Sequence, residues 1–286
     1  MIINTNVLAL NSHRAMKNVG ASQAQASARL SSGLKINSAA DDAAGLAISE
    51  KMRAQIRGLD MASKNAQDGS SLVQTAEGGL QQIDDMVQRA RELTVQAAND
   101  TNDEKDRGKI AQEMTNLFEE IDSMADRVEF NGKKLINGSF SAAASALYLQ
   151  VGANQSQSIQ FTIGAMKVSD LGLSDLASAV KSAANAGSWG ATGGQIDNFL
   201  ANLDTAVGKV TDQRSRLGAI QNRLDYTMKS LDISSENLSA SESRIRDTDM
   251  AKEMMSLTKA NVLSSAATSM LSQANQAPQN VLQLLR

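Results

Sequence analysis

Apolar side chains in the last third of the chain recur at alternating spacings of four and three residues. The positions are Ile196, Leu200, Leu203, Val207, Val210, Arg214, Leu217, Gln221, Leu224, Met228, Leu231, Ser235 and Leu238. A seven-residue repeat of this kind forms a seam along one face of an α-helix, and the seam is buried against a partner helix in a shallow left-handed supercoil. The pattern therefore predicts a long helix that packs against other long helices.

Two earlier stretches supply the expected partners. They are Ile110, Met114, Leu117, Ile121, Met124 and Val128, and Met52, Ile56, Leu59, Ser63, Ala66, Ser70 and Val73, continued less strictly by Ala76, Leu80, Ile83, Val87 and Ala90. With the cap signals, we predict helices over about 4–30, 42–98 and 103–129, a long one after 194, and a last one towards 286. Gly33 is the expected stop of the first helix, Gly78-Gly79 an expected bend, and Thr101 with Glu104 an expected capping box.

Between these helices the pattern changes to that of strands. Asn131-Gly132 and Asn137-Gly138 are tight-turn dipeptides, and the alternating sets Leu147, Leu149, Val151 and Ile159, Phe161, Ile163 predict a β-hairpin with one apolar face near 130–165. The Gly- and Ser-rich segment 185–194 predicts a flexible, exposed connection, with Trp189 exposed in it. The expected fold class is mainly α, a long-helix coiled-coil bundle with a small β-hairpin region.

Composition agrees with long helices and narrows the function. The chain of 286 residues has one proline, 3% aromatic residues and no cysteine. The net charge of −3 and the absence of a Lys/Arg run argue against nucleic-acid binding. No apolar run approaches the roughly 20 residues of a membrane span, and the first residues do not form a signal peptide.

No residue pattern indicates catalysis, a cofactor or a metal. His13 is the only histidine, and a metal site needs several converging ligands. Phosphate-loop and nucleophile-elbow motifs are absent, and the carboxylate pairs Asp41-Asp42, Asp84-Asp85 and Glu119-Glu120 are more typical of caps and solvated faces. We therefore expect a protein that is not an enzyme.

The two ends of the chain differ from the middle. Residues before about 33 and after about 249 are rich in Ala, Ser, Gln and Asn, and each end forms a marginal helix alone. Four aliphatic residues, Val281, Leu282, Leu284 and Leu285, nevertheless lie at the terminus, where a monomer has nowhere to bury them. We infer that the ends become ordered when several chains pack together.

Six stretches in sequence order resemble bacterial flagellins. They are Ile3–Leu10, Leu30–Asn37, Asp41–Ile48, Gln88–Leu93, Glu242–Asp247 and Gln273–Arg286. The resemblance covers both termini and the helical body, and it implies a structural subunit that self-assembles into the flagellar filament for swimming. It also implies the family's D0 layer at 1–43 and 244–286, whose helices fold on assembly into an inner coiled-coil tube, and its D1 layer at 44–243. Only the short flexible segment 170–194 is left for an outer domain.

The resemblance further implies partners and a location. The partners are further copies of the chain, the flagellar cap and hook-junction proteins and an export chaperone, with no nucleic acid and no membrane. Secretion through the flagellar type III apparatus without a cleaved signal peptide would bring the protein to the extracellular filament. In flagellins that activate the animal flagellin-sensing Toll-like receptor, the contact residues match Arg89, Leu93 and Glu113. Val281, Leu284 and Leu285 match a terminal motif read by cytosolic sensors.

The sequence also allows other interpretations of these residues and of the chain. Arg89, Glu92 and Glu113 can equally form ion pairs between helices, with Leu93 packed between subunits. A hook–filament junction protein of the same superfamily would share the end helices but not the longer motifs. A secreted enzyme or adhesin on a helical scaffold would need a catalytic constellation or a large extra domain, and neither is visible in the sequence.

Overall fold

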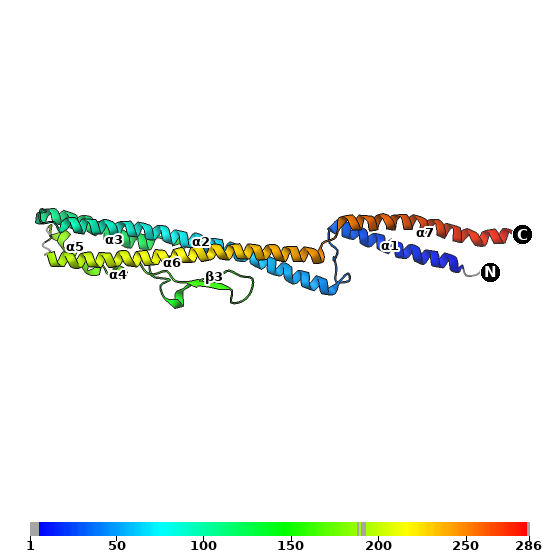
Figure 1. Cartoon of the computed structure of the whole chain (residues 1–286), viewed down its shortest axis with the longest axis horizontal. Helices are drawn as coiled ribbons and strands as arrows, with labels where there is room; N and C mark the ends of the chain where they lie inside the picture. The colour runs from blue at the N-terminus through cyan, green and yellow to red at the C-terminus, as the bar shows by residue number, and fades with distance from the viewer. Residues whose placement is uncertain (1–5, 188, 190–192, 285–286) are drawn as a thin grey trace. The chain divides into compact units, whose positions relative to one another are not determined.

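The computed structural model describes residues 6–187, 189 and 193–284. These residues form two compact units, 1–56 with 236–286 and 57–235, so the division falls within two long helices. In chain order the elements are α1 (Val7–Ser32), α2 (Ala43–Ala97), α3 (Glu104–Arg127), β1 (Glu129–Phe130), β2 (Lys133–Lys134), a short 3-10 turn (Ala143–Ser145), β3 (Leu147–Gln150), β4 (Ser158–Phe161), α4 (Val168–Leu171), α5 (Ser174–Ala186), α6 (Gly193–Arg246) and α7 (Met250–Leu284) (Figure 1). The predicted mainly α fold is confirmed.

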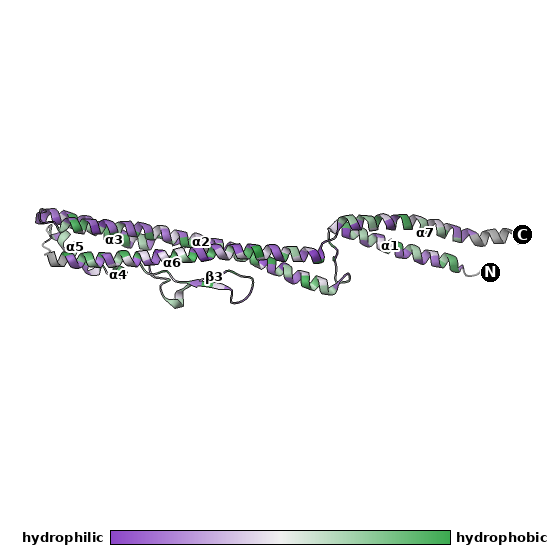
Figure 2. Ribbon diagram, in the orientation of Figure 1, coloured by the Kyte–Doolittle hydropathy of each residue, from purple (hydrophilic) through white to green (hydrophobic). Residues whose placement is uncertain are grey.

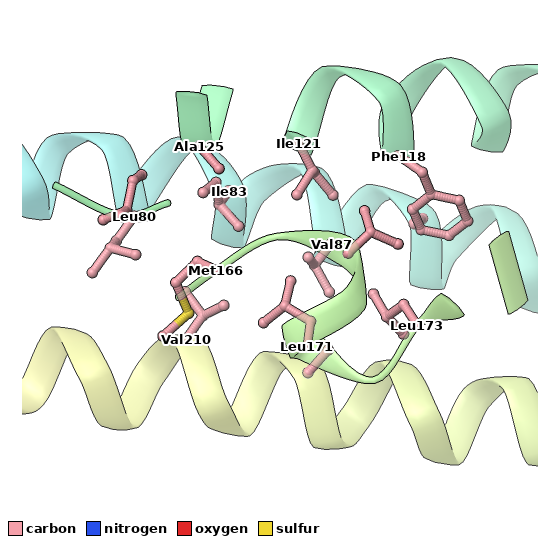
Figure 3. Packing of buried hydrophobic residues seen from close by; sticks show 14 of the residues in the cluster. Leu80, Ile83, Val87, Phe118, Ile121, Ala125, Met166, Leu171, Leu173 and Val210 are labelled. Carbon is pink, nitrogen blue, oxygen red and sulfur yellow. The ribbon is translucent and has the colours of Figure 1, made fainter. Parts of the chain in front are cut away.

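The unit formed by residues 57–235 is built on the predicted seams. Leu203, Val210, Leu217 and Leu224 of α6 are fully buried, one in every seven residues. Apolar positions alternate with polar ones along these helices (Figure 2), so each helix buries one stripe and leaves the rest in water. Figure 3 shows side chains of α2 and α3 directed towards Met166 and the α4 segment, with Val210 of α6 beside them. The heptad pattern therefore predicted the core correctly.

The expected β-hairpin is present as β3 and β4. The strands are antiparallel, with Leu147 opposite Phe161 and Leu149 opposite Ile159, so the apolar residues share one face as predicted. A Cβ atom at Gly69 of α2 would collide with the Leu149 side chain. The glycine is therefore required by the close approach of the hairpin to α2.

A second, smaller ladder lies between α3 and the hairpin. β1 and β2 pair through the Asn131-Gly132 turn, in which both residues adopt left-handed conformations, with φ of 50° and 74°. Positive φ at both central residues is the requirement of a type I′ turn, which explains the Asn-Gly dipeptide. This turn was correctly predicted.

The segment 170–194 differs from the expected flexible loop. Most of it is helical, because α4 and α5 lie within 168–186. Leu176, Val180 and Ala183 of α5 are buried in the core, and their spacing of four and three residues is that of a helical face. The surrounding Ser, Ala and Gly residues suggested a loop, so the short apolar stripe of α5 was not recognised in the sequence. The prediction of an exposed Trp189 is also wrong, since its side chain is only 4% exposed.

Three local predictions can be compared with the helix ends and with α2. Gly33 ends α1 in a left-handed conformation with φ of 72°, as predicted. The capping box at Thr101 is wrong, because Asp103 caps α3 by accepting a hydrogen bond from the Glu104 N–H. α2 continues through Gly78 and Gly79 as one helix, and a Cβ at Gly79 would lie 2.6 Å from Val128 Cγ2. Close packing, rather than the expected bend, accounts for Gly79.

In the unit formed by 1–56 and 236–286, α1 packs along α7. The two connections next to these helices are joined by backbone hydrogen bonds, with Lys35 N 2.6 Å from Arg246 O and Thr248 N 3.0 Å from Gly33 O. The buried Arg246 side chain donates to Glu50 at 2.6 Å. These bonds fix where α6 ends and α7 begins, within the charged run at 244–249.

Candidate assembly surface and contact sites

The apolar residues that the α1–α7 pair buries completely are small, and its larger apolar residues are partly buried or exposed. Among its described side chains, the buried apolar ones are Ala26, Ala260 and Ala274. Polar contacts add to the pairing: Gln23 Nε2 donates to Asn261 Oδ1 at 2.8 Å, and Asn6 Nδ2 donates to the Ala274 carbonyl at 2.8 Å. Alanines contribute little buried area, so the pair by itself has only a thin apolar contact.

Many of the large apolar side chains of the same two helices are exposed, whereas Met16, Val19 and Leu257 are partly buried. The exposed ones form what we call the α1–α7 apolar surface: Val7, Leu8, Leu10, Met250, Met254, Met255, Val262, Leu263 and Met270, each 45 to 68% exposed. Single exposed apolar residues are ordinary, but a concentration of them on one helix pair marks an interaction surface. The exposed apolar residues give the pair a surface that further helices can cover.

The exposed residues of α7 also spread around the helix. At about 100° per residue, the span from Met250 through Met255 to Leu263 covers more than half of the circumference. One neighbouring helix buries a narrower stripe than this. We infer that α7 has contacts with more than one additional helix when the surface is covered.

Arg89 of α2 lies at the centre of a charged cluster with α3. Its Nη2 and Nε atoms lie 2.9 and 3.2 Å from Glu113 Oε1, and its Nη1 lies 3.0 Å from Glu92 Oε2. The hydrogen bond to Glu113, and then that to Glu92, raises the pKa of Arg89 above its ordinary value. The three side chains are about half exposed or more, so a partner can reach them.

Leu93 lies one turn further along α2 but cannot join that surface. Its side chain is 1% exposed and belongs to the apolar core. The expected receptor contact therefore divides into two parts: Arg89 and Glu113 are together on the surface, whereas Leu93 supports the helix from inside. Packing of Leu93 between subunits is excluded for the same reason.

The terminal motif can be placed only in part. Val281 and Leu284 belong to the last turns of α7, and their side chains lie outside the described part of the structure. Leu285 lies outside the described residues altogether.

The described residues include no cluster of side chains that could bind a metal ion. No group of three or more His, Cys, Asp or Glu side chains in that set could hold a metal ion, and His13 lies exposed on α1. None of the described helices is both long and apolar enough to span a bilayer.

Three features were not found from the sequence. Asp84 of α2 and Arg214 of α6 form an ion pair at 3.2 Å within the apolar seam. Trp189 stacks on Phe199 with ring centroids 6.2 Å apart. A groove of about 890 Å³ runs between the hairpin and α6, lined in part by Ile159 and Tyr226. The sequence signal for the Asp84–Arg214 ion pair was the charged residue Arg214 at a position of the apolar heptad seam.

Comparisons with known proteins bear on the whole chain. The family of the bacterial flagellin N-terminal helical region matches residues 3–141, and that of the bacterial flagellin C-terminal helical region matches residues 200–285. The chain is 49% identical to a flagellin of Bacillus subtilis and 50% identical to a flagellin of Halalkalibacterium halodurans. It is 44% identical to flagellin FlaB2 of Treponema pallidum. Each alignment covers 100% of both chains.

Solved structures share the fold at lower identity. A protein assigned as a flagellar hook-associated protein of Vibrio parahaemolyticus superposes with a TM-score of 0.61 at 13% identity, covering 72% of this chain and 100% of that one. FlgL of Bacillus cereus gives a TM-score of 0.51 at 17% identity, covering 66% and 97%. At these identities the likeness concerns the fold alone.

Proposed function

This chain belongs to the bacterial flagellin family, and we propose that it is a structural subunit that polymerises into the flagellar filament. The observation that carries the proposal is the α1–α7 apolar surface, because it leaves large apolar side chains in water until other copies cover them. Repeating the same contact between identical chains generates a helical polymer.

The two parts of the chain are packed differently, and we propose a different role in the filament for each. The unit at 57–235 has a core of its own, filled by the seams of α2, α3 and α6. The α1–α7 pair buries only alanines completely and leaves many large apolar side chains exposed, so its ordering depends on neighbouring copies. On this basis we assign 1–43 and 244–286 to an inner layer that folds on assembly, and 44–243 to a surrounding layer.

A hook–filament junction protein is the less favoured alternative. Full-length identity of about half supports a filament subunit, whereas the likeness to the hook-associated protein is limited to 13% identity and to the fold. The family is structural, and we propose no enzymatic activity.

We also propose an export route, neighbours in the flagellum and a receptor contact for this chain. The chain leaves the cell through the flagellar type III apparatus, with an export chaperone before assembly and cap and hook-junction proteins as neighbours in the flagellum. The animal flagellin-sensing receptor contacts the exposed Arg89–Glu113 pair. Arg89→Ala should lower signalling in receptor-reporter cells, whereas Arg91→Ala, which removes a similarly exposed arginine of α2, should not. An unchanged response to Arg89→Ala would remove Arg89 from this proposal.

Electron microscopy after salt-induced polymerisation tests the main function. The full chain should form long uniform filaments, and a chain that lacks residues 250–286 should form none although its unit at 57–235 still unfolds cooperatively on heating. Filaments from the truncated chain would contradict a role for α7 in assembly. Failure of the full chain to polymerise under all salt conditions would favour the junction role.

A further inference from the structure

Among the methionine side chains that the structure describes, most of the highly exposed ones lie on α7. Met114 and Met166 are buried in the core. The large exposed ones are Met61 on α2 and four on α7, namely Met250, Met254, Met255 and Met270, which we call the outer methionines. Three of these four lie within the first two turns of α7, and Met255, at 68%, is the most exposed.

We propose that the outer methionines are an oxidation site at which peroxide or hypohalous acid switches off assembly of the free chain. The inference rests on the proposed function, because its consequence is read in polymerisation. In the free chain these side chains are 48 to 68% exposed and open to an oxidant, and the proposed filament contact covers them.

The reaction balances without any further reactant. A lone pair of the methionine sulfur attacks one oxygen of hydrogen peroxide, the S–O bond forms and the O–O bond breaks. The sulfur loses two electrons to become a sulfoxide, and the departing oxygen takes them and leaves as water after proton transfer. Hypohalous acid delivers the same oxygen with loss of a halide ion and a proton.

The product is incompatible with the surface that carries it. A thioether is apolar and flexible, and it packs well against irregular neighbours. A sulfoxide carries a strongly polar oxygen, and burying that oxygen without a donor is unfavourable. Up to four such groups on one helix would oppose covering α7 by other helices. Leucine has a similar volume to methionine and is not oxidised by peroxide. A Met→Leu variant therefore shows the effect of losing the thioether without the effect of adding an oxygen.

The test treats the monomeric full chain with hydrogen peroxide and maps the added oxygen, about 16 Da each, by peptide mass analysis. The tryptic peptide 253–259 reports on Met254 and Met255, the peptide 58–64 on Met61, and the peptide 135–167 on buried Met166. Polymerisation is then measured as the critical concentration by sedimentation. The matched variant carries Met250→Leu, Met254→Leu, Met255→Leu and Met270→Leu, and it keeps Met61.

We expect peptide 253–259 to be oxidised well before peptide 135–167, and the critical concentration of the oxidised chain to rise at least tenfold. Methionine sulfoxide reductases should restore it. The leucine variant should polymerise before and after peroxide, although its Met61 is oxidised. If that variant does not polymerise untreated, the reductase recovery of the wild-type chain remains the deciding measurement.

Two results would overturn the inference. One is unchanged polymerisation of a chain whose outer methionines are shown to be sulfoxides. The other is loss of polymerisation by the peroxide-treated leucine variant, which would assign the effect to other residues. Polymerisation of the untreated wild-type chain tests the proposed function, and its absence would overturn both the function and the inference. The two results above arise only when the untreated chain polymerises, so they overturn the inference alone.

Discussion

Arg214 of α6 and Asp84 of α2 form an ion pair inside a seam whose other nearby members are apolar, with Arg214 Nη1 3.2 Å from Asp84 Oδ2. Gln88 Nε2 donates to the same oxygen at 3.1 Å. The Asp84 side chain is 9% exposed, and its Oδ1 atom has no hydrogen-bond partner among the described residues. Such a pair contributes little net stability but makes the loss of one member costly, because a buried charge is left alone.

Removing Arg214 alone should therefore destabilise the chain more than removing both partners. We expect Arg214→Leu to lower the free energy of unfolding by about 2–3 kcal/mol, and Asp84→Leu with Arg214→Leu to recover most of that loss. Arg91 and Asp204 link the same two helices at 2.6 Å but are about half exposed, so Arg91→Leu should cost less than about 1 kcal/mol. Urea unfolding of the three variants and the wild-type chain measures these differences, and a double variant no more stable than Arg214→Leu would contradict the buried-charge explanation.

The single tryptophan should report on the fold of the unit at 57–235. The Trp189 side chain is buried and stacks on Phe199, and the Trp189 backbone N–H donates to the Glu104 backbone carbonyl at 3.3 Å. Its fluorescence should be blue-shifted in the folded chain and move to the red on unfolding. Trp189→Ala should cost about 3 kcal/mol, whereas Tyr148→Ala, at an exposed site, should cost far less. A solvent-like emission maximum in the native protein would show that Trp189 is not buried.

Two glycines of α2 should respond in opposite ways to the same substitution. Gly78→Ala should stabilise the chain by up to about 1 kcal/mol, because alanine favours helix and nothing lies within 4 Å of the added Cβ. Gly69→Ala should destabilise it by about 1–3 kcal/mol, because the Cβ meets Leu149 of the hairpin. Thermal unfolding of both variants tests the docking of the hairpin on α2, and equal effects would argue against it.

These cases show what the sequence could and could not predict. Repeats such as Leu203, Val210 and Leu217 predicted α6, and alternation predicted the apolar face of the β3–β4 hairpin, because both patterns are local. Interpreted locally, Gly69 only weakens a helix, and its role depends on Leu149, far away in the chain. Trp189 was misjudged for the same reason, since its flanking glycines indicate a loop and only the tertiary fold supplies Phe199. Leu93 matched a contact motif, but sequence does not distinguish a motif residue on the surface from one in the core.

The connection before α2 should weaken in acid. Asp41 Oδ2 accepts hydrogen bonds from the Ser38 N–H and the Ser38 hydroxyl, both at 3.0 Å. The Ser38 backbone bond is the main cause that lowers the pKa of Asp41 below its ordinary value of 3.8. Since the folded pKa is lower than the unfolded one, the stabilisation is complete above about pH 4 and is lost as the pH falls through the folded pKa.

A carboxyl titration by nuclear magnetic resonance measures this pKa directly. The Asp41 signal should titrate below 3.8, and Ser38→Ala should leave a smaller shift, because the backbone bond stays and the hydroxyl bond is lost. An Asp41 pKa at or above 3.8 would contradict the observed hydrogen bonds.

The exposed apolar side chains of α7 should drive polymerisation. The most direct test is the critical concentration for filament formation of Met254→Lys with Met255→Lys, measured beside Met61→Lys, which places a charge at a similarly exposed methionine outside the α1–α7 apolar surface. We expect the double variant to stay monomeric at concentrations at which both Met61→Lys and the wild-type chain form filaments. Normal filaments from the double variant, or an equal loss in Met61→Lys, would contradict the central role of this surface.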